Sequence, residues 1–136
     1  MDLKDLTPKS DDVVVTIKHP LTEEVLLNDD GSEMTITVYA PHSKDYKKVL
    51  HALANARIKK VQKKGKVAGF EDMSLEELEE MSLDTLSKTT KEWNITFGGE
   101  CPKLTIEKAK ELYTEVFWIK AQIEEALNNY LGFMKV

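Results

Sequence analysis

The sequence has few of the residues on which disulfide-rich domains and metal proteins depend. It contains one cysteine, Cys101, among 136 residues, which excludes an intramolecular disulfide framework and a cysteine-rich zinc site. It contains three histidines, and no two of them have the HExxH spacing of a zinc-binding helix. Its longest apolar runs are a few residues long, whereas a transmembrane helix needs about 20. We therefore expect no membrane span, no metal site and no cofactor.

The start of the chain is polar and acidic, which argues against a signal peptide. Hydrophobic residues make up 41% of the sequence and charged residues 32%, so there is enough apolar surface to form a core. A chain of this length usually forms one domain. The composition predicts a soluble, intracellular-type protein with a flexible N-terminal arm at residues 1–12 and a single α+β domain at residues 13–136.

Residues 13–40 have the composition of a small β-sheet. Val13–Lys18 is rich in β-branched side chains and ends at a His-Pro step, where proline removes a backbone donor. Asp30-Gly31 marks a tight turn, and residues 33–39 then alternate between apolar and polar side chains, which is the period of a half-buried strand. With a short apolar piece at residues 24–27, these segments predict an antiparallel sheet of two or three strands. The side chains of the second strand expected to share one face are Met34, Ile36 and Val38.

Residues 42–136 are mostly helical by pattern. Apolar side chains at helical spacing predict a first helix at about residues 44–64. A capping box at Ser74–Glu77 predicts the start of a second helix, because the serine oxygen and the glutamate satisfy each other's backbone amides. A similar start signal follows eight residues later, which predicts a kink or break near Ser82.

Residues 92–100 are predicted to be a β-like or irregular connector. Thr105 is expected to cap a third helix, and the apolar segment Val116–Ile119 joins it to a fourth, either as a bend in the core or as a docking surface. We expect three or four helices to cover the apolar face of the sheet, which is too small to be stable alone. The amphipathic stripe of the fourth helix is Ile119, Ile123, Ala126, Leu127 and Tyr130.

The charge is strongly segregated although the net charge is only −5. Residues 42–66 carry nine basic side chains and one acid, and residues 71–84 carry seven acids and no base. Clustered lysines on the helix 44–64 are compatible with nucleic-acid binding through counterion release. The alternative is a solvated helix that faces the acidic helix after it. We favour the second interpretation, because no aromatic stacking platform is interleaved with the lysines.

No catalytic motif is present, so we expect a protein that is not an enzyme. The three histidines lie in a turn, beside a helix start and on the basic helix, and Cys101 has no CxxC partner. The acidic run Glu76–Glu80 is distributed around a helix, so its carboxylates do not converge on a metal. A small enzyme that uses Cys101 or a histidine remains the alternative of a different class.

Most aromatic residues lie in the last 44 residues, where they are expected to fill the core between the third and fourth helices. Trp118 and Phe133 are the candidates for interface anchors, because tryptophan is a frequent hot-spot residue and Phe133 lies close to the end of the sequence. The segregated charge also suits self-association or docking on charged partners. The candidate partner-binding residues are Trp118, Ile119, Phe133, Lys59, Lys60 and Lys63.

Two groups of short motifs occur in a fixed order along residues 13–133. The N-terminal group is His19-Pro20-Leu21-Thr22-Glu23, Asp30-Gly31 and Tyr39-Ala40-Pro41-His42-Ser43. The C-terminal group is Trp93-Asn94-Ile95, Gly99, Pro102, Leu112-Tyr113 and Trp118-Ile119-Lys120-Ala121-Gln122-Ile123. In the order and spacing of these motifs, the chain resembles the tail assembly chaperones of tailed bacteriophages.

Two positions depart from the pattern of that family. A glycine is expected after the threonine of the His-Pro turn, where Glu23 stands, and a proline before the tryptophan, where Phe117 stands. The second departure predicts that the third and fourth helices run together. Neither departure removes a catalytic group, since the family has none.

The resemblance implies a non-enzymatic role in bacteriophage morphogenesis. Proteins of this family bind the tape-measure protein and help to recruit tail-tube subunits, so these are the implied partners. The implied location is the host cytoplasm during assembly. Two alternatives remain open: a structural protein of the virion (neck, tail-completion or capsid-decoration), and a nucleic-acid-binding regulator that uses the basic helix 44–64.

Overall fold

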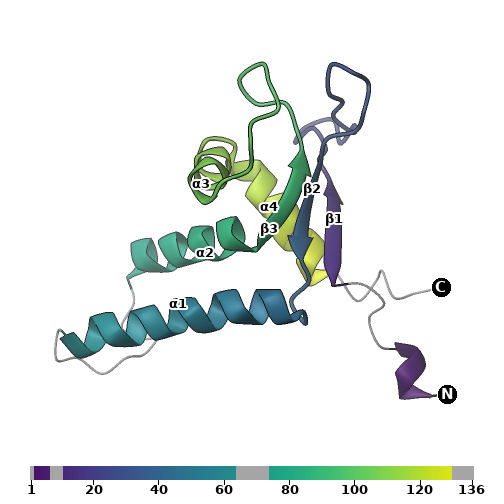
Figure 1. Ribbon diagram of the computed structural model, residues 1–136. Helices are drawn as coiled ribbons and strands as arrows, with labels where there is room; N and C mark the ends of the chain where they lie inside the picture. The colour runs from purple at the N-terminus through teal and green to yellow at the C-terminus, as the bar shows by residue number, and fades with distance from the viewer. Residues whose placement is uncertain (1, 7–10, 64–73, 130–136) are drawn as a thin grey trace.

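The fold is an antiparallel sheet of three strands with helices on one side (Figure 1). The computed structural model describes residues 2–6, 11–63 and 74–129, and only the backbone at residues 5–6 and 59–63. This part of the chain has the predicted α+β architecture. In chain order its elements are η1 (Leu3–Leu6), β1 (Asp12–Thr16), β2 (Thr35–Tyr39), α1 (Lys44–Lys63), α2 (Leu75–Thr89), β3 (Thr90–Asn94), α3 (Ile106–Glu115) and α4 (Phe117–Asn128).

The sheet has the order β1-β2-β3, and both strand pairs are antiparallel. Val14 of β1 lies opposite Thr37 of β2, which lies opposite Glu92 of β3, so the three side chains share one face. Val14 is 57% exposed on that face, whereas Ile36 and Val38 on the other face are completely buried. Ile36 and Val38 lie on the core face as predicted, but the expected half-buried alternation of β2 is not seen in its exposure, because Thr37 on the opposite face is also buried.

The connection between β1 and β2 confirms the predicted turn. It extends past both strands as a narrow ribbon with isolated bridges, one of them between Leu27 and Glu33. At its tip Gly31 has a φ of +87°, a conformation that costs a glycine nothing, and its amide donates to the carbonyl of Asn28 at 2.9 Å. The short apolar piece predicted at residues 24–27 forms part of this ribbon and is not a full strand.

Residues 13–40, predicted to form two or three strands, contribute two strands to the sheet. The third strand, β3, follows α2 directly, and its residues 92–94 belong to the segment predicted as a β-like or irregular connector. Its sequence, TKEWN, has little apolar periodicity, and only Thr90 is buried. Pairing with β2 defines this strand, and the Trp93 indole strengthens its position by donating to the carbonyl of Pro102 at 2.9 Å. The strand is therefore a product of tertiary pairing rather than of local propensity.

Helix α2 is continuous, so the break predicted near Ser82 does not occur. The first start signal is real, because the Ser74 hydroxyl accepts a hydrogen bond from the amide of Glu77. The second signal is overridden, because Ser82 is surrounded by strong helix formers and lies half-buried in mid-helix. The predicted cap of the third helix is confirmed, since Thr105 accepts from the amide of Lys108.

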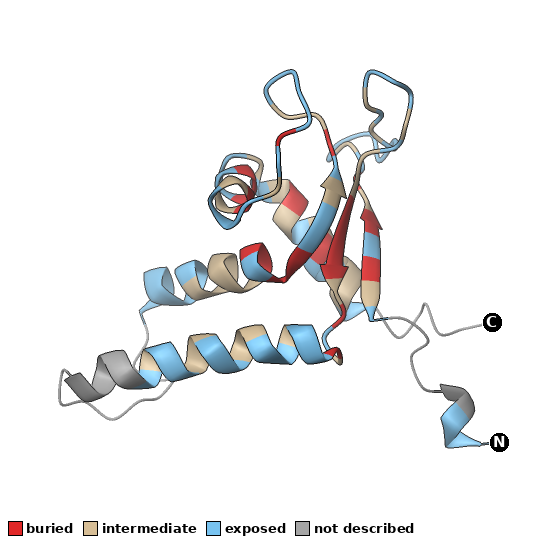
Figure 2. Cartoon of the chain, in the orientation of Figure 1, coloured by how far each residue is buried: buried red, intermediate tan, exposed pale blue. Residues whose placement is uncertain are grey.

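The core lies between the sheet and the C-terminal half of α2 with α3 and α4 (Figure 2). Helix α4 contacts β1, and its Gln122 extends the edge of the sheet: the side-chain amide donates to the Lys18 carbonyl at 2.8 Å and accepts from the Lys18 amide at 3.0 Å. No helix in the described ranges has the length and apolar character to cross a membrane. The largest fully buried side chains include Tyr113, Ile17, Ile36 and Ile123.

Candidate interaction surface

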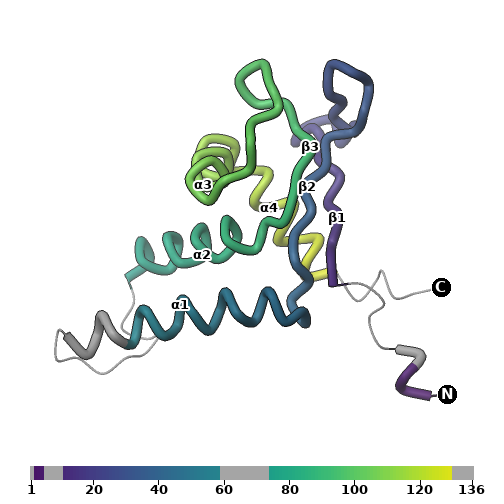
Figure 3. The backbone as a smooth tube through the Cα atoms, viewed as in Figure 1, coloured from purple at the N-terminus to yellow at the C-terminus, as the bar shows by residue number. Residues whose placement is uncertain are grey.

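Helices α1 and α2 form an antiparallel pair that extends away from the sheet, and we call this pair the arm (Figure 3). Helix α1 has 20 residues and makes its main contacts with α2. The predicted first helix at 44–64 is thus confirmed, but its surroundings differ from those of a core helix. Only the end of α2 next to β3 reaches the core, where Leu86 and Thr89 are buried.

The described part of the arm is thinly packed except where α2 reaches the core. No side chain described in α1 is buried, although Tyr46, Leu50 and Leu53 form a half-buried stripe. The outer half of α2 is entirely exposed, and Leu75 and Leu78 are 73% and 40% exposed. Two helices that touch only each other can cover one side of an apolar stripe and leave its flanks in solvent. The arm therefore presents apolar side chains that nothing in the described fold covers.

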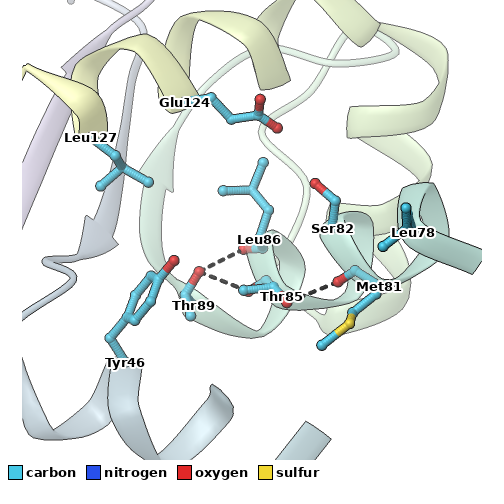
Figure 4. Close-up of a pocket in the computed structure, with 9 residues that line it drawn as sticks. All are labelled: Tyr46, Leu78, Met81, Ser82, Thr85, Leu86, Thr89, Glu124 and Leu127. Atoms are coloured by element: carbon cyan, nitrogen blue, oxygen red, sulfur yellow. Dashed lines mark hydrogen bonds between the residues drawn. The ribbon is translucent and has the colours of Figure 1, made fainter. Parts of the chain in front are cut away.

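A groove of about 340 Å³ opens beside the arm, between α1, α2 and α4 (Figure 4). The Tyr46 side chain of α1 and Leu127 of α4 face it from opposite sides. Most of the lining comes from one face of α2. The lining residues are Tyr46, Leu78, Met81, Ser82, Thr85, Leu86, Thr89, Glu124 and Leu127.

The groove is more apolar than its composition suggests. The hydroxyl groups of Thr85 and Thr89 each donate back to a carbonyl of α2, four residues earlier, at 2.8 Å (Figure 4). Both hydroxyl protons are thus used within the helix, so these two threonines offer no free donor to the groove. On the α1 side of the groove, burial and the nearby carboxylate of Glu124 raise the pKa of Tyr46 above its ordinary value.

A second cavity of about 200 Å³ lies between α1 and α2. The Met81 side chain lines both cavities, and methionine is a flexible side chain that adapts to irregular space. Arg57 bridges the helices here by donating to the Glu77 carboxylate at 2.8 Å, which holds the pKa of Glu77 below its usual value.

The two helices of the arm carry opposite charge. Lys44, Lys47 and Lys48 of α1 are exposed, and so are Glu76, Glu79 and Glu80 of α2. The arrangement agrees with the interpretation that the basic helix faces the acidic one, since Arg57 is held by Glu77. The predicted binding residues Lys59, Lys60 and Lys63 fall in α1, but their side chains lie outside the described residues.

Two of the three predicted apolar anchors, Trp118 and Ile119, lie in α4. Ile119 is 6% exposed and belongs to the core, so its assignment to a binding surface is corrected. Trp118 is half-buried and packs against the core, while its neighbour Phe117 is 73% exposed. The two helices do not run together as predicted from the missing proline: α3 ends at its cap Val116, whose backbone is not helical, and α4 begins at the next residue, Phe117. Phe133 lies outside the described residues.

Sequence reasoning missed the groove, although it named several of its residues. Tyr46, Met81 and Leu127 stand at regular positions of amphipathic stripes, and such stripes were read as core. A stripe specifies which face of a helix is apolar, but it does not specify whether a neighbour closes over that face. The imbalance of charge between α1 and α2 was the one sequence signal that pointed to this part of the molecule.

The candidate chemical residues do not assemble into a site. The Nδ1 atom of His19 accepts from the amides of Leu21 and Thr22 at 3.1 and 3.3 Å, and the Nε2 atom of His42 lies 3.1 Å from an Asp11 carboxylate oxygen. Cys101 is exposed in a loop. Across the ranges that the structure describes, no group of three or more His, Cys, Asp or Glu residues is placed to hold a metal ion.

The turn that His19 organises contains an unusual backbone conformation. Glu23 has a φ of 62° and is the one residue other than glycine, within the described ranges, in the left-handed region. This is the position where the phage family is expected to have glycine. This backbone conformation raises the energy of an L-residue by roughly 1–2 kcal/mol, because its Cβ crowds the following carbonyl. The turn therefore has a backbone conformation that glycine favours, although glutamate occupies the position.

We expect Glu23→Gly to stabilise the protein by about 0.5–1 kcal/mol, the relief of strain less the extra flexibility that glycine gives the unfolded chain. Urea unfolding followed by circular dichroism measures this change. Glu23→Ala is the control, since it removes the charge but keeps the Cβ. An equal stability of the two variants would show that the left-handed conformation is not the cause.

Comparison of the chain with models of protein families, with curated proteins and with solved structures found no match in any of the three.

Proposed function

We propose that this chain is a non-enzymatic assembly factor of bacteriophage morphogenesis, a tail assembly chaperone that holds a partner protein in the groove of the arm. The observation that carries the proposal is the open apolar groove between α1, α2 and α4, beside exposed leucines of α2. Exposed apolar surface with charged borders is characteristic of protein-binding sites.

The motifs that resemble the phage family support the proposal in two places. Gln122, within the C-terminal group of motifs, anchors α4 to Lys18 at the edge of the sheet. Glu23, where a glycine is expected, adopts the conformation that glycine favours. Both residues position the scaffold rather than the groove, so they support the resemblance in fold and leave the identity of the partner to experiment.

The proposed partners are the tape-measure and tail-tube proteins made from the same phage genome. We expect one of them to bind the purified chain, and Leu78→Glu to weaken that binding by about tenfold or more, because a carboxylate in the groove must be desolvated against apolar side chains. Leu78 is 40% exposed, so the fold should tolerate the change. Biolayer interferometry measures the affinity, and circular dichroism checks the fold.

Leu21→Glu is the matched control, since Leu21 is 87% exposed in the turn after His19 and does not line the groove. Equal affinities of the two variants would remove the groove from the proposal, and absence of binding to both partners would remove the chaperone function. Mass spectrometry of purified particles distinguishes a chaperone from a structural protein of the virion. A chaperone is absent from the virion, whereas a neck, tail-completion or decoration protein is present in fixed copy number.

A further inference from the structure

We propose that the groove beside the arm is the docking site of residues 130–136 of the same chain, which follow α4 and its cap. These residues lie outside the described part of the chain, so the proposal rests on the groove and on the sequence of the segment. It assigns an occupant to the groove in the free protein and requires no phage partner. Competition between the segment and a partner is the one consequence that rests on the proposed function.

The end of α4 brings the segment to the groove. Leu127 lines the groove, and α4 ends one residue later at Asn128. In Figure 4, Leu127 and Tyr46 lie across from each other near one end of the groove, and Leu78 lies at the other end. The chain therefore leaves α4 beside one end of the groove. Attachment at this point gives residues 130–136 an effective concentration of about a millimolar, so even weak binding would keep the groove occupied.

The segment has a composition that suits the groove. Its sequence is Tyr-Leu-Gly-Phe-Met-Lys-Val, so five of its seven residues are apolar and none is acidic. Among the described lining residues Glu124 is the one with a charge, and its carboxylate lies 3.2 Å from the ammonium group of Lys120. The groove therefore needs no cation from its occupant. Since Thr85 and Thr89 offer no free donor, the groove favours an occupant that is mainly apolar.

The groove and the segment also agree in size. A volume of about 340 Å³ is at the small end of the range for ligand pockets, about 300–1,000 Å³, so the groove admits a few side chains of a short segment. Gly132 is the residue type that best permits a chain reversal. The four residues after it span about 13 Å when extended. Ser82 lies about 10 Å along α2 from Thr89, so the segment can turn back and reach the middle of the groove.

The other segments outside the described residues suit the groove less well. Residues 7–10 are Thr-Pro-Lys-Ser and include no large apolar side chain. Residues 64–73 connect α1 and α2 at the end of the arm away from the sheet, and they include the acids Glu71 and Asp72. Phe133, which the sequence suggested as an anchor for a partner, is therefore assigned to the groove of its own chain.

A spin label on this segment of the full-length chain tests the proposal. Cys101 is exposed and would also react with the label, so Cys101→Ser is combined with Lys135→Cys, and the new cysteine carries a nitroxide. We expect the label to broaden the NMR amide signals of Ser82 and Thr85, which line the groove. The amide signal of Gly31, at the tip of the ribbon between β1 and β2, should not change. Broadening limited to the end of α4 overturns the proposal.

Attachment alone keeps the label near α4, so a second labelled chain carries Leu131→Asp and Phe133→Asp. We expect the broadening at Ser82 and Thr85 to fall at least about fivefold, because a carboxylate in the groove must be desolvated against apolar side chains. Equal broadening in the two chains would show that the apolar side chains do not hold the segment, and this overturns the proposal. Leu21→Asp is the matched control, since Leu21 is 87% exposed outside the groove and its replacement should leave the broadening unchanged.

A mixture of chains distinguishes docking within one copy from exchange between two copies. It contains spin-labelled chain without isotope and isotope-labelled chain without the spin label. Broadening at Ser82 in this mixture would place the segment of one copy in the groove of another, which overturns docking within one chain. No signal change at Ser82 supports it.

The spin-label result and the chaperone function can fail separately. The label is read without any phage protein, so a negative result leaves the chaperone function to its own test, and the absence of a phage partner leaves a positive result standing. Where the proposed function holds, the chain with Leu131→Asp and Phe133→Asp should bind its partner at least about threefold more tightly, because more of the groove is open. Weaker binding would assign the segment to the contact with the partner and overturn the proposal.

Discussion

Ile123→Ala is expected to destabilise the protein by about 3–4 kcal/mol, the largest effect of any single truncation in α4. Ile123 is completely buried, and it lies in the middle of the helix that packs on β1. Truncation removes apolar contacts on both sides of the helix–sheet boundary and leaves a cavity that two regular elements cannot close by relaxing. Urea unfolding followed by tryptophan fluorescence measures the loss.

Phe117→Ala is the control for Ile123→Ala, because it truncates an exposed side chain of the same helix. Phe117 is in the same helix and is the larger side chain, but it is 73% exposed, so we expect a change within about 0.5 kcal/mol. The pair tests the register of α4 directly. If Phe117→Ala were the more destabilising variant, the helix would be rotated from the orientation described, and Ile119 would return as a candidate for the surface.

Alkaline pH should destabilise the protein through Tyr113. This side chain is 1% exposed, and its hydroxyl lies 2.6 Å from the hydroxyl of Thr90. Since Thr90 donates its own proton to the carbonyl of Leu86 at 2.8 Å, it accepts from Tyr113. Burial raises the pKa of Tyr113 to about 12, compared with an ordinary value of 10.0.

The sign of the effect follows from the two states. Above pH 10 the unfolded chain loses the tyrosine proton, while the folded protein keeps it up to about pH 12, so the stability due to Tyr113 is complete below pH 10 and is lost across this interval. The free energy of unfolding falls by roughly 3 kcal/mol, because the pKa of Tyr113 differs by about two units between the folded and unfolded states. Urea titrations at pH 8, 10 and 12 measure it.

Tyr113→Phe provides the control, because it cannot ionise. We expect it to cost about 1 kcal/mol at pH 8, the value of one buried hydrogen bond, and to show a smaller decline at high pH. Thr90 keeps its bond to Leu86 in this variant, so no buried donor is left without a partner. Equal alkaline declines in the two proteins would assign the effect to other ionising groups.

Local signals predicted the positions at which backbone chemistry is decisive. Ser74 and Thr105 begin helices because their hydroxyls accept from amides that have no partner within the helix, and Gly31 makes its turn because it can adopt a positive φ. The start signal at Ser82 failed for a related reason. A serine caps a helix only where the chain before it is not helical, and here the preceding turn of α2 already was.

The sequence pattern did not predict which strands pair or which helix faces are covered by neighbouring elements. β3 exists because β2 offers it an edge, and Ile119 is buried because α4 packs on the sheet, although the segment Val116–Ile119 is apolar on all sides. The same limit applies to the groove. Tyr46 and Leu127 are regular members of two amphipathic stripes, and the stripes are separated by most of the chain.

The sequence alone determined the helices, the first two strands, the turn between them and the division of charge between α1 and α2, because each of these depends on residues that are close neighbours along the chain. The tertiary structure alone decided that the third strand follows α2 and that, among the described residues, the groove beside the arm is left open. These two features depend on which surfaces meet in space, and burial on contact is a cooperative property of the folded chain that no local segment encodes.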